Sequence, residues 1–294
     1  MKTILLAVDF IPVSQSVMVW AKLFARRYNA ELILVHVAAM VMPSPSIPAI
    51  GGAGLGMGMT MGEAMPLTAE PVLEDQLIVL GRQLQAEGIA CRTALRRGGI
   101  DEAILDAAKE YRVDLIIVGR SHIGNFFDRL VGSTAADVAA SAHQPVLIIP
   151  ASHQSDQAEA APDVSLQRIV FSTPLEFDEA DIFEQVVDLA QTFGASLRLL
   201  QVKSENQPNI NDDADLFAPL QAVYGAEPLA VDQVESSTVT GGINDYLAEN
   251  TVDLLVMATR ERGFLTGLLN PSLTGKMILR SDVPLLVYQV KGDL

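Results

Sequence analysis

The chain contains the same order of strands and helices twice, and this internal repeat restricts its fold more than any other feature. Residues 4–8 form a short apolar run typical of a buried strand, and adding 165 to each number gives a second such run, residues 169–173. Later in the chain the offset is 139, so that residues 113–118 correspond to residues 252–257. Each copy alternates strands with helices, an order typical of a doubly wound parallel sheet. The sequence therefore predicts an α/β protein built from two copies of one fold.

A polar segment separates the two copies. Residues 151–165 contain Ser, Gln, Asp, Glu and one proline, a composition typical of a flexible linker. We therefore expect one domain over residues 1–150 and a second domain over residues 166–294.

The two different offsets mean that the first copy carries extra residues in its middle. Six of the ten methionines lie in the segment from Met40 to Met65, which also contains six glycines between residues 51 and 62. Three interpretations remain open for this segment. It is a surface loop, an adaptable partner contact or lid, or a soft-metal site formed by Met57, Met59 and Met61.

The charge of the chain excludes some classes of partner. Lys and Arg number 20 against 36 Asp and Glu, and the formal net charge of −16 argues against nucleic acid and anionic membranes as partners. Residues 1–150 hold 12 basic and 14 acidic side chains, a net of −2, whereas residues 151–294 hold 8 and 22, a net of −14. A phosphate-bearing ligand is therefore tolerated by the first copy and opposed by the second.

The sequence also indicates the compartment. The single cysteine, Cys91, excludes an intramolecular disulfide. The apolar run that ends at Asp9 is too short for a secretory signal. The uncharged residues 32–62 include three prolines and six glycines, so they cannot form a continuous membrane helix. We expect a cytoplasmic protein without a membrane span.

The residues suited to a ligand follow the first and fourth strands of the first copy. Ligands of open parallel sheets bind beyond the carboxyl ends of the strands where the strand order reverses, and the loops there begin at Asp9 and Gly119. Glycine lets phosphate oxygens approach the backbone, and Ser133 and Thr134 begin a predicted helix whose first N–H groups attract anions. Asp9 is able to accept hydrogen bonds from ribose or adenine. A turn or capping role explains these residues equally well.

The pattern of these residues resembles that of the universal stress protein family over nearly the full length of both copies. Residues 118–124, 132–134 and 144–149 carry the resemblance. It implies a tandem member with two Rossmann-like five-stranded sheets of order 3-2-1-4-5, as in adenine nucleotide alpha hydrolases. It also implies that ATP, or ADP or AMP, binds to the first copy, with Mg²⁺ as an optional companion. Carried over by position, the ligand residues are Asp9, Val37, Val118, Gly119, Ser121, His122, Gly124, Gly132, Ser133 and Thr134.

Both copies depart from the family pattern G-x2-G-x9-G-[S/T]. In the first copy His122 stands in place of the second glycine, where its imidazole either crowds the phosphates or donates to them. In the second copy the positions of Asp9, Gly119, His122 and Gly132 hold Pro174, Ala258, Glu261 and Pro271. Proline has no N–H to donate and glutamate repels phosphate. We therefore expect the second copy to serve as a pseudo-dimer partner and interaction surface without binding ATP.

Three functional classes remain open. The leading hypothesis is a stress-response regulatory protein that binds ATP in its first copy; the alternatives are a nucleotide-independent scaffold and a slow ATPase. Hydrolysis needs a water-activating base and usually a metal, and no residue stands out as catalytic. The fifth strands, residues 146–149 and 285–290, are predicted sheet edges, which in this family typically pair with each other. A further homodimer and an unknown protein partner also remain open.

The remaining polar candidates have structural explanations. His36 lies inside an apolar strand and is expected to pack there, and Cys91 is expected in the core. His143 has no companion at metal-ligand spacing. Arg120 and Arg129 either steer phosphates or are solvated.

Overall fold

The computed structural model describes residues 1–10, 14–38, 69–120, 133–150, 164–173, 180–204, 221–222, 224–225, 229–260, 277 and 281–290. We call residues 1–150 the first half and residues 166–294 the second half. The first half contains β1 (Thr3–Ala7), α1 (Ser14–Tyr28), β2 (Glu31–Ala38), α2 (Ala69–Ala86), β3 (Cys91–Arg97), α3 (Ile100–Glu110), β4 (Leu115–Arg120), α4 (Ser133–Ser141) and β5 (Val146–Pro150). The second half contains β6 (Arg168–Ser172), α5 (Ala180–Phe193), β7 (Ser196–Ser204), β8 (Ala230–Ser236), α7 (Val239–Glu249), β9 (Leu254–Arg260) and β10 (Leu285–Val290). The methionine-rich residues 40–65 lie outside the described residues.

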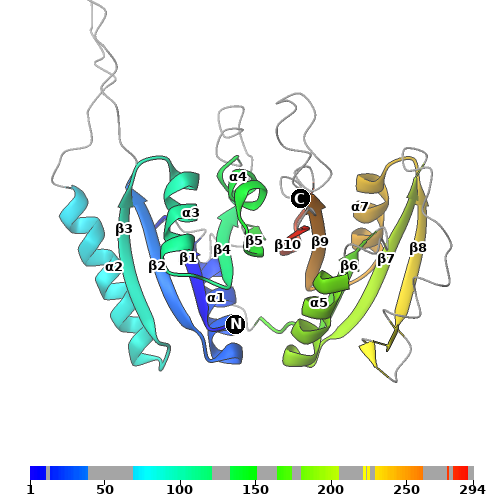
Figure 1. Ribbon diagram of the computed structural model, residues 1–294, viewed down its shortest axis with the longest axis horizontal. Coiled ribbons are helices and arrows are strands. Elements are labelled where there is room, and N and C mark those ends of the chain that lie inside the picture. The colour runs from blue at the N-terminus through cyan, green and yellow to red at the C-terminus, as the bar shows by residue number, and fades with distance from the viewer. Residues whose placement is uncertain are drawn as a thin grey trace, which may run out of the picture.

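The strands form one sheet in the order β3-β2-β1-β4-β5-β10-β9-β6-β7-β8 (Figure 1). Counted from its own first strand, each half has the order 3-2-1-4-5, and all pairs within a half are parallel. β5 and β10 pair antiparallel, as the resemblance implied for the fifth strands, and this pairing joins the two predicted five-stranded sheets into one. Each of these strands would otherwise leave a row of backbone groups unpaired at an edge.

The strand register reproduces both offsets of the sequence repeat. Thr3 lies opposite Glu31 in the first half, and 165 residues later Arg168 lies opposite Ser196. The first and fourth strands pair equivalently in the two halves, with Ile4 opposite Leu115 and Ile169 opposite Leu254. Ile169 follows Ile4 by 165 residues, and Leu254 follows Leu115 by 139. The repeat found in the sequence is therefore a repeat of strand pairing.

Two matching polar contacts secure the beginning of each first strand. The Asp114 carboxylate accepts hydrogen bonds from the backbone N–H groups of Lys2 and Thr3, at 2.5 and 3.0 Å. Asp253 accepts two such bonds from residues 167 and 168, at 2.9 and 2.8 Å. The first helices of the two halves also end alike, since Asn29 and Gly194 have φ of 49° and 66°, the left-handed conformation that often ends a helix.

Both faces of the sheet are covered by helices, and both cores continue through the β5–β10 joint. Helices α1, α2 and α5 cover one face, and α3, α4 and α7 cover the other (Figure 1). Leu147 of β5 and Leu286 of β10 belong to the first core, and their neighbours Ile148 and Leu285 belong to the second. The two halves therefore share their hydrophobic cores as well as their sheet.

Replacing Leu286 with alanine should destabilise the whole chain, because this side chain is fully buried and lies opposite Leu147 at the joint. We expect the free energy of unfolding to fall by about 2–5 kcal/mol, the usual cost of such a cavity. Chemical denaturation measures it. Val79→Ala is the control, since Val79 is 52% exposed. Equal effects of the two substitutions would contradict a buried joint.

The outer strands of the second half are linked by a polar network. Arg198 on β7 donates two hydrogen bonds to the Asp232 carboxylate on β8, at 2.7 and 2.5 Å. The Tyr246 hydroxyl on α7 donates a third, at 2.5 Å. The Arg198 guanidinium and the Tyr246 hydroxyl hold the pKa of Asp232 below its usual value. This network ties α7 and the last two strands together.

The lowered pKa of Asp232 predicts a pH-dependent contribution to stability. The ionised carboxylate is favoured by folding, so its contribution is present above the unfolded pKa, about 3.9, and is lost as the pH falls through the folded pKa. We expect Asp232→Asn to lower the free energy of unfolding at pH 7 by up to about 1 kcal/mol. The difference from wild type should shrink below about pH 4. Urea denaturation across this pH range measures it, and a pH-independent difference would refute the prediction.

Candidate functional site

The first half has its strand-order reversal between β1 and β4. The chain leaves β1 toward β2 on one side and β3 beyond it, and later returns to β4 on the other side. Ala7 lies opposite Val35, and the Val8 N–H donates to the Val35 oxygen at 2.8 Å, so β1 and β2 stay paired up to the residue before Asp9. Gly119 lies near the end of β4, the other neighbour of β1. The carboxyl ends of three adjacent strands thus meet where open α/β sheets bind their ligands.

The predicted ligand residues differ in their solvent exposure at this edge. Asp9 and Gly119 are exposed, whereas Val37 is half-buried. Val118 is 3% exposed and packs in the core beneath α3 and α4, so only its backbone is available to a ligand. Ser133 begins α4, and Thr134 follows it as a half-buried residue. The other predicted residues, Ser121, His122, Gly124 and Gly132, lie outside the described residues.

His36 supports the turn that carries Asp9. Its Nδ1 lies 2.7 Å from the backbone oxygen of Val8, and its ring centroid lies 5.0 Å from that of Phe10. Phe10 has a φ of 57°, the left-handed conformation that reverses the chain after Asp9. His36 was predicted to serve only in packing, and this polar role was missed. The available signal was a single polar residue within the apolar run of residues 32–38.

The first turn of α4 contributes unpaired backbone N–H groups to the same part of the fold. Farther along this helix the electrostatics change sign. Burial raises the pKa of Asp137, and the nearby Asp101 carboxylate on α3 raises it further. The acidic pair therefore confines any attraction for an anion to the beginning of α4.

The equivalent edge of the second half is built differently. Val202 occupies the position of Val37 but is only 4% exposed. Helix α7 packs directly on it, since a Cβ on Gly242 would lie 2.5 Å from Val202 Cγ1. Gln201, in the position of His36, is 2% exposed and accepts a hydrogen bond from Gln233 at 2.9 Å. The apolar surface that Val37 leaves partly exposed in the first half is therefore covered by α7 in the second half.

Arg120 requires a correction. The solvated alternative is wrong, because Arg120 is only 4% exposed and its Nη2 donates to the backbone oxygen of Ser281 at 2.5 Å. Burial lowers the pKa of its guanidinium, and the nearby Asp282 carboxylate opposes this shift. The side chain thus extends from the end of β4 into the second half. Arg129 lies outside the described residues.

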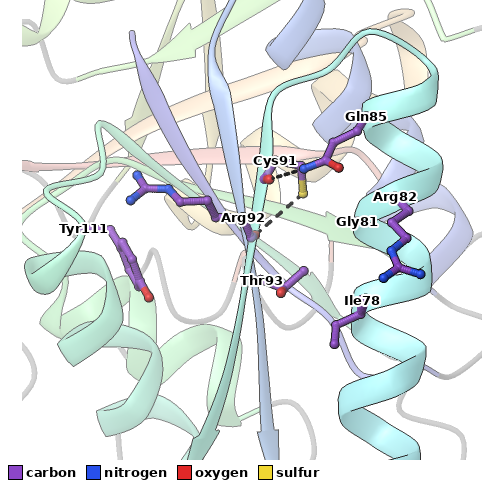
Figure 2. Close-up of a pocket in the computed structure, with 8 residues that line it drawn as sticks. All are labelled: Ile78, Gly81, Arg82, Gln85, Cys91, Arg92, Thr93 and Tyr111. Carbon is purple, nitrogen blue, oxygen red and sulfur yellow. Dashed lines mark hydrogen bonds between the residues drawn. The ribbon is translucent and has the colours of Figure 1, made fainter.

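A groove of about 470 Å³ lies at the outer edge of the first half, between α2 and β3 (Figure 2). Its polar groups largely satisfy one another: Gln85 donates to the Cys91 carbonyl at 2.9 Å, and the Arg92 guanidinium lies over the Tyr111 ring at 5.2 Å. Burial raises the pKa of the Cys91 thiol to about 11, which confirms Cys91 as a core residue. The groove lies two strands away from β1, so it is separate from the candidate site.

Two kinds of feature are absent from the described part of the chain. Its helices include none with the length and apolarity needed to cross a membrane. Its His, Cys, Asp and Glu side chains form no group of three or more that is arranged to hold a metal ion.

The sequence matches the model of the universal stress protein family over residues 1–150 and again over residues 167–289. The chain belongs to the universal stress protein family. Since the two matches cover the two halves, it is a tandem member.

Relatives of this universal stress protein match mainly one half of it. Universal stress protein A of Salmonella typhimurium is 28% identical over 149 residues, which cover 51% of this chain and 94% of the relative. A universal stress protein of Mycolicibacterium smegmatis is 27% identical over 157 residues, 53% of this chain. That match covers 49% of the relative, so the aligned region spans about half of its length.

Solved structures also resemble the whole chain. A universal stress protein from Archaeoglobus fulgidus matches 100% of this chain and 98% of its own, with a TM-score of 0.71 and 21% identity, which shows the shared fold. Universal stress proteins solved in complex with cAMP and with dAMP match 51% and 50% of this chain, with TM-scores of 0.36 and 0.35.

Replacing His36 with phenylalanine should weaken the turn after β1. The new ring retains contact with Phe10 but leaves the Val8 carbonyl without its imidazole partner, so we expect a loss of about 1 kcal/mol in the free energy of unfolding. Urea denaturation measures this loss. The control is His143→Phe, at an exposed histidine of the same half. The supporting role of His36 is disproved if both variants unfold like wild type.

Proposed function

We propose that this chain is a stress-response regulatory protein that binds an adenine nucleotide, ATP foremost, in its first half. The observation that supports the proposal is that Asp9 follows β1, Val37 lies near the end of β2 and Gly119 lies near the end of β4, three adjacent strands at the strand-order reversal. Helix α4 comes next in the chain after β4. Membership of the universal stress protein family supports a nucleotide as the ligand of such an edge. We place this function in the cytoplasm.

The residues present are suited to the parts of an adenine nucleotide. The exposed carboxylate of Asp9 is able to accept hydrogen bonds from ribose hydroxyls, and the half-buried Val37 offers an apolar surface to a base. Gly119 has no side chain to obstruct a phosphate, and the first N–H groups of α4 favour its charge. Mg²⁺ would accompany the phosphates of ATP as part of the ligand.

The differences between the halves support assigning the nucleotide to the first. The second half covers Val202 with α7, holds Ala258 in place of Gly119, and carries most of the negative charge. We propose that residues 166–294 form a second domain that binds no nucleotide and acts as a built-in partner of the first. Since β5 and β10 already pair with each other, this joint leaves neither strand open to a second copy.

Calorimetric titration of the full chain with ATP, ADP, AMP, cAMP and dAMP tests the proposal. We expect wild type to bind at least one of these nucleotides. Asp9→Ala should weaken this binding by about tenfold or more, because a hydrogen bond to a charged group contributes about 1.5–3 kcal/mol. Asp106→Ala is the matched control, since Asp106 is an exposed aspartate on α3 of the same half.

The outcomes separate the functional classes. Negligible binding of all five nucleotides to wild type would overturn the proposal and favour a nucleotide-independent scaffold. Binding that Asp9→Ala and Asp106→Ala leave equally unchanged would remove Asp9 from the site. Multiple-turnover release of phosphate from ATP would instead indicate a slow ATPase.

A further inference from the structure

Two side-chain contacts cross from one half to the other close to the candidate site. The first is the hydrogen bond from Arg120, the last residue of β4, to the backbone oxygen of Ser281. Both residues are 4% exposed, so this contact is shielded from water. Arginine remains protonated in proteins, and a buried charge requires partners of this kind. The second half therefore supplies a buried partner for Arg120.

The second contact runs in the opposite direction. Gln289, on β10, donates its side-chain N–H to the backbone oxygen of Ala139 on α4. Ala139 is 1% exposed and lies in the core that α4 shares with β4 and β5. A residue of the second half thus holds α4, the helix whose N-terminus contributes to the proposed phosphate side of the site.

These contacts reach the two elements that form the phosphate side of the proposed site. Gly119 lies on β4 next to Arg120, and the first turn of α4 offers backbone N–H groups to an anion. We infer that the second half positions the phosphate-binding part of the first half, with Arg120 and Gln289 as positioning residues. The inference rests on the proposed function and specifies which part of that site depends on the joint.

The contacts are not repeated in the other direction. By the offset of 139 residues, Thr259 is the second-half equivalent of Arg120, and Pro150 is the first-half equivalent of Gln289. Threonine lacks the length of arginine, and proline has no side-chain donor. Both polar bridges therefore serve the half that retains Asp9 and Gly119.

The inference predicts a selective effect on phosphate binding. Asp9 and Val37 lie on and beside β1 and β2, which neither bridge contacts, so binding of adenosine should not depend on Arg120 or Gln289. Binding of ATP should depend on them, because its phosphates are expected to lie beside Gly119 and the first turn of α4. If Arg120 and Gln289 had a purely structural role, replacing them would weaken the binding of both ligands together or lower only the free energy of unfolding.

The test uses the full chain and three variants, titrated with ATP and with adenosine. We expect Arg120→Met and Gln289→Met to raise the dissociation constant of ATP about tenfold, which is a usual size of coupling between two sites. The dissociation constant of adenosine should stay unchanged. Arg120→Lys retains a donor for the Ser281 oxygen and should recover part of the affinity for ATP. If Arg120→Met fails to fold, Gln289→Met still tests the inference, because Gln289 is only partly buried.

Gln233→Met is the matched control, since it removes a side-chain hydrogen bond within the second half, away from the joint. Hydrogen exchange of the α4 amides without nucleotide provides a second readout, and Gln289→Met should accelerate this exchange while Gln233→Met does not. The inference is overturned if wild type binds ATP and the variants of Arg120 and Gln289 bind it equally well. If wild type binds neither ATP nor adenosine, the proposed function itself is contradicted. If Gln289→Met also leaves the hydrogen exchange of α4 unchanged, Gln289 does not anchor this helix.

Discussion

The antiparallel pairing of β5 with β10 is the interaction on which the rest of the structure depends. It satisfies the backbone groups of two strands that would otherwise be edges, and it makes two five-stranded sheets into one. It also brings the helices together across the joint: Phe24 of α1 and Phe193 of α5 lie with ring centroids 5.0 Å apart. Tyr288 of β10 is buried in the same core, and this burial raises the pKa of its hydroxyl.

Most of the fold could be predicted from the sequence because its determinants are local or periodic. The two offsets of the repeat recur in the registers of the strand pairs, so the equivalence of the two copies could be found without the structure. The periodicity of the sequence alone did not predict that the two sheets are joined; the pairing of the fifth strands came from the resemblance. Whether β5 and β10 remain edges depends on how residues far apart in the chain meet, and their apolar runs look the same in either case.

The candidate site was predictable to a smaller extent, for the same reason. Asp9 follows β1 and Gly119 lies near the end of β4, two strands whose order could be anticipated. His36 and Arg120 were misjudged because the sequence does not show what surrounds them. The imidazole acts through a carbonyl 28 residues away, and the guanidinium is buried by a residue 161 positions later. Val118 shows the converse, since its side chain belongs to the core although its neighbour Gly119 is exposed.

The covalent link between the halves has a consequence for how this joint can evolve. In a symmetric homodimer every substitution appears on both sides of the two-fold axis, so each new contact must suit two copies at once. A tandem chain is free of that requirement, and Arg120 can differ from Thr259 just as Gln289 differs from Pro150. One half is then able to specialise as the support of the other, a division that two identical subunits related by symmetry cannot encode.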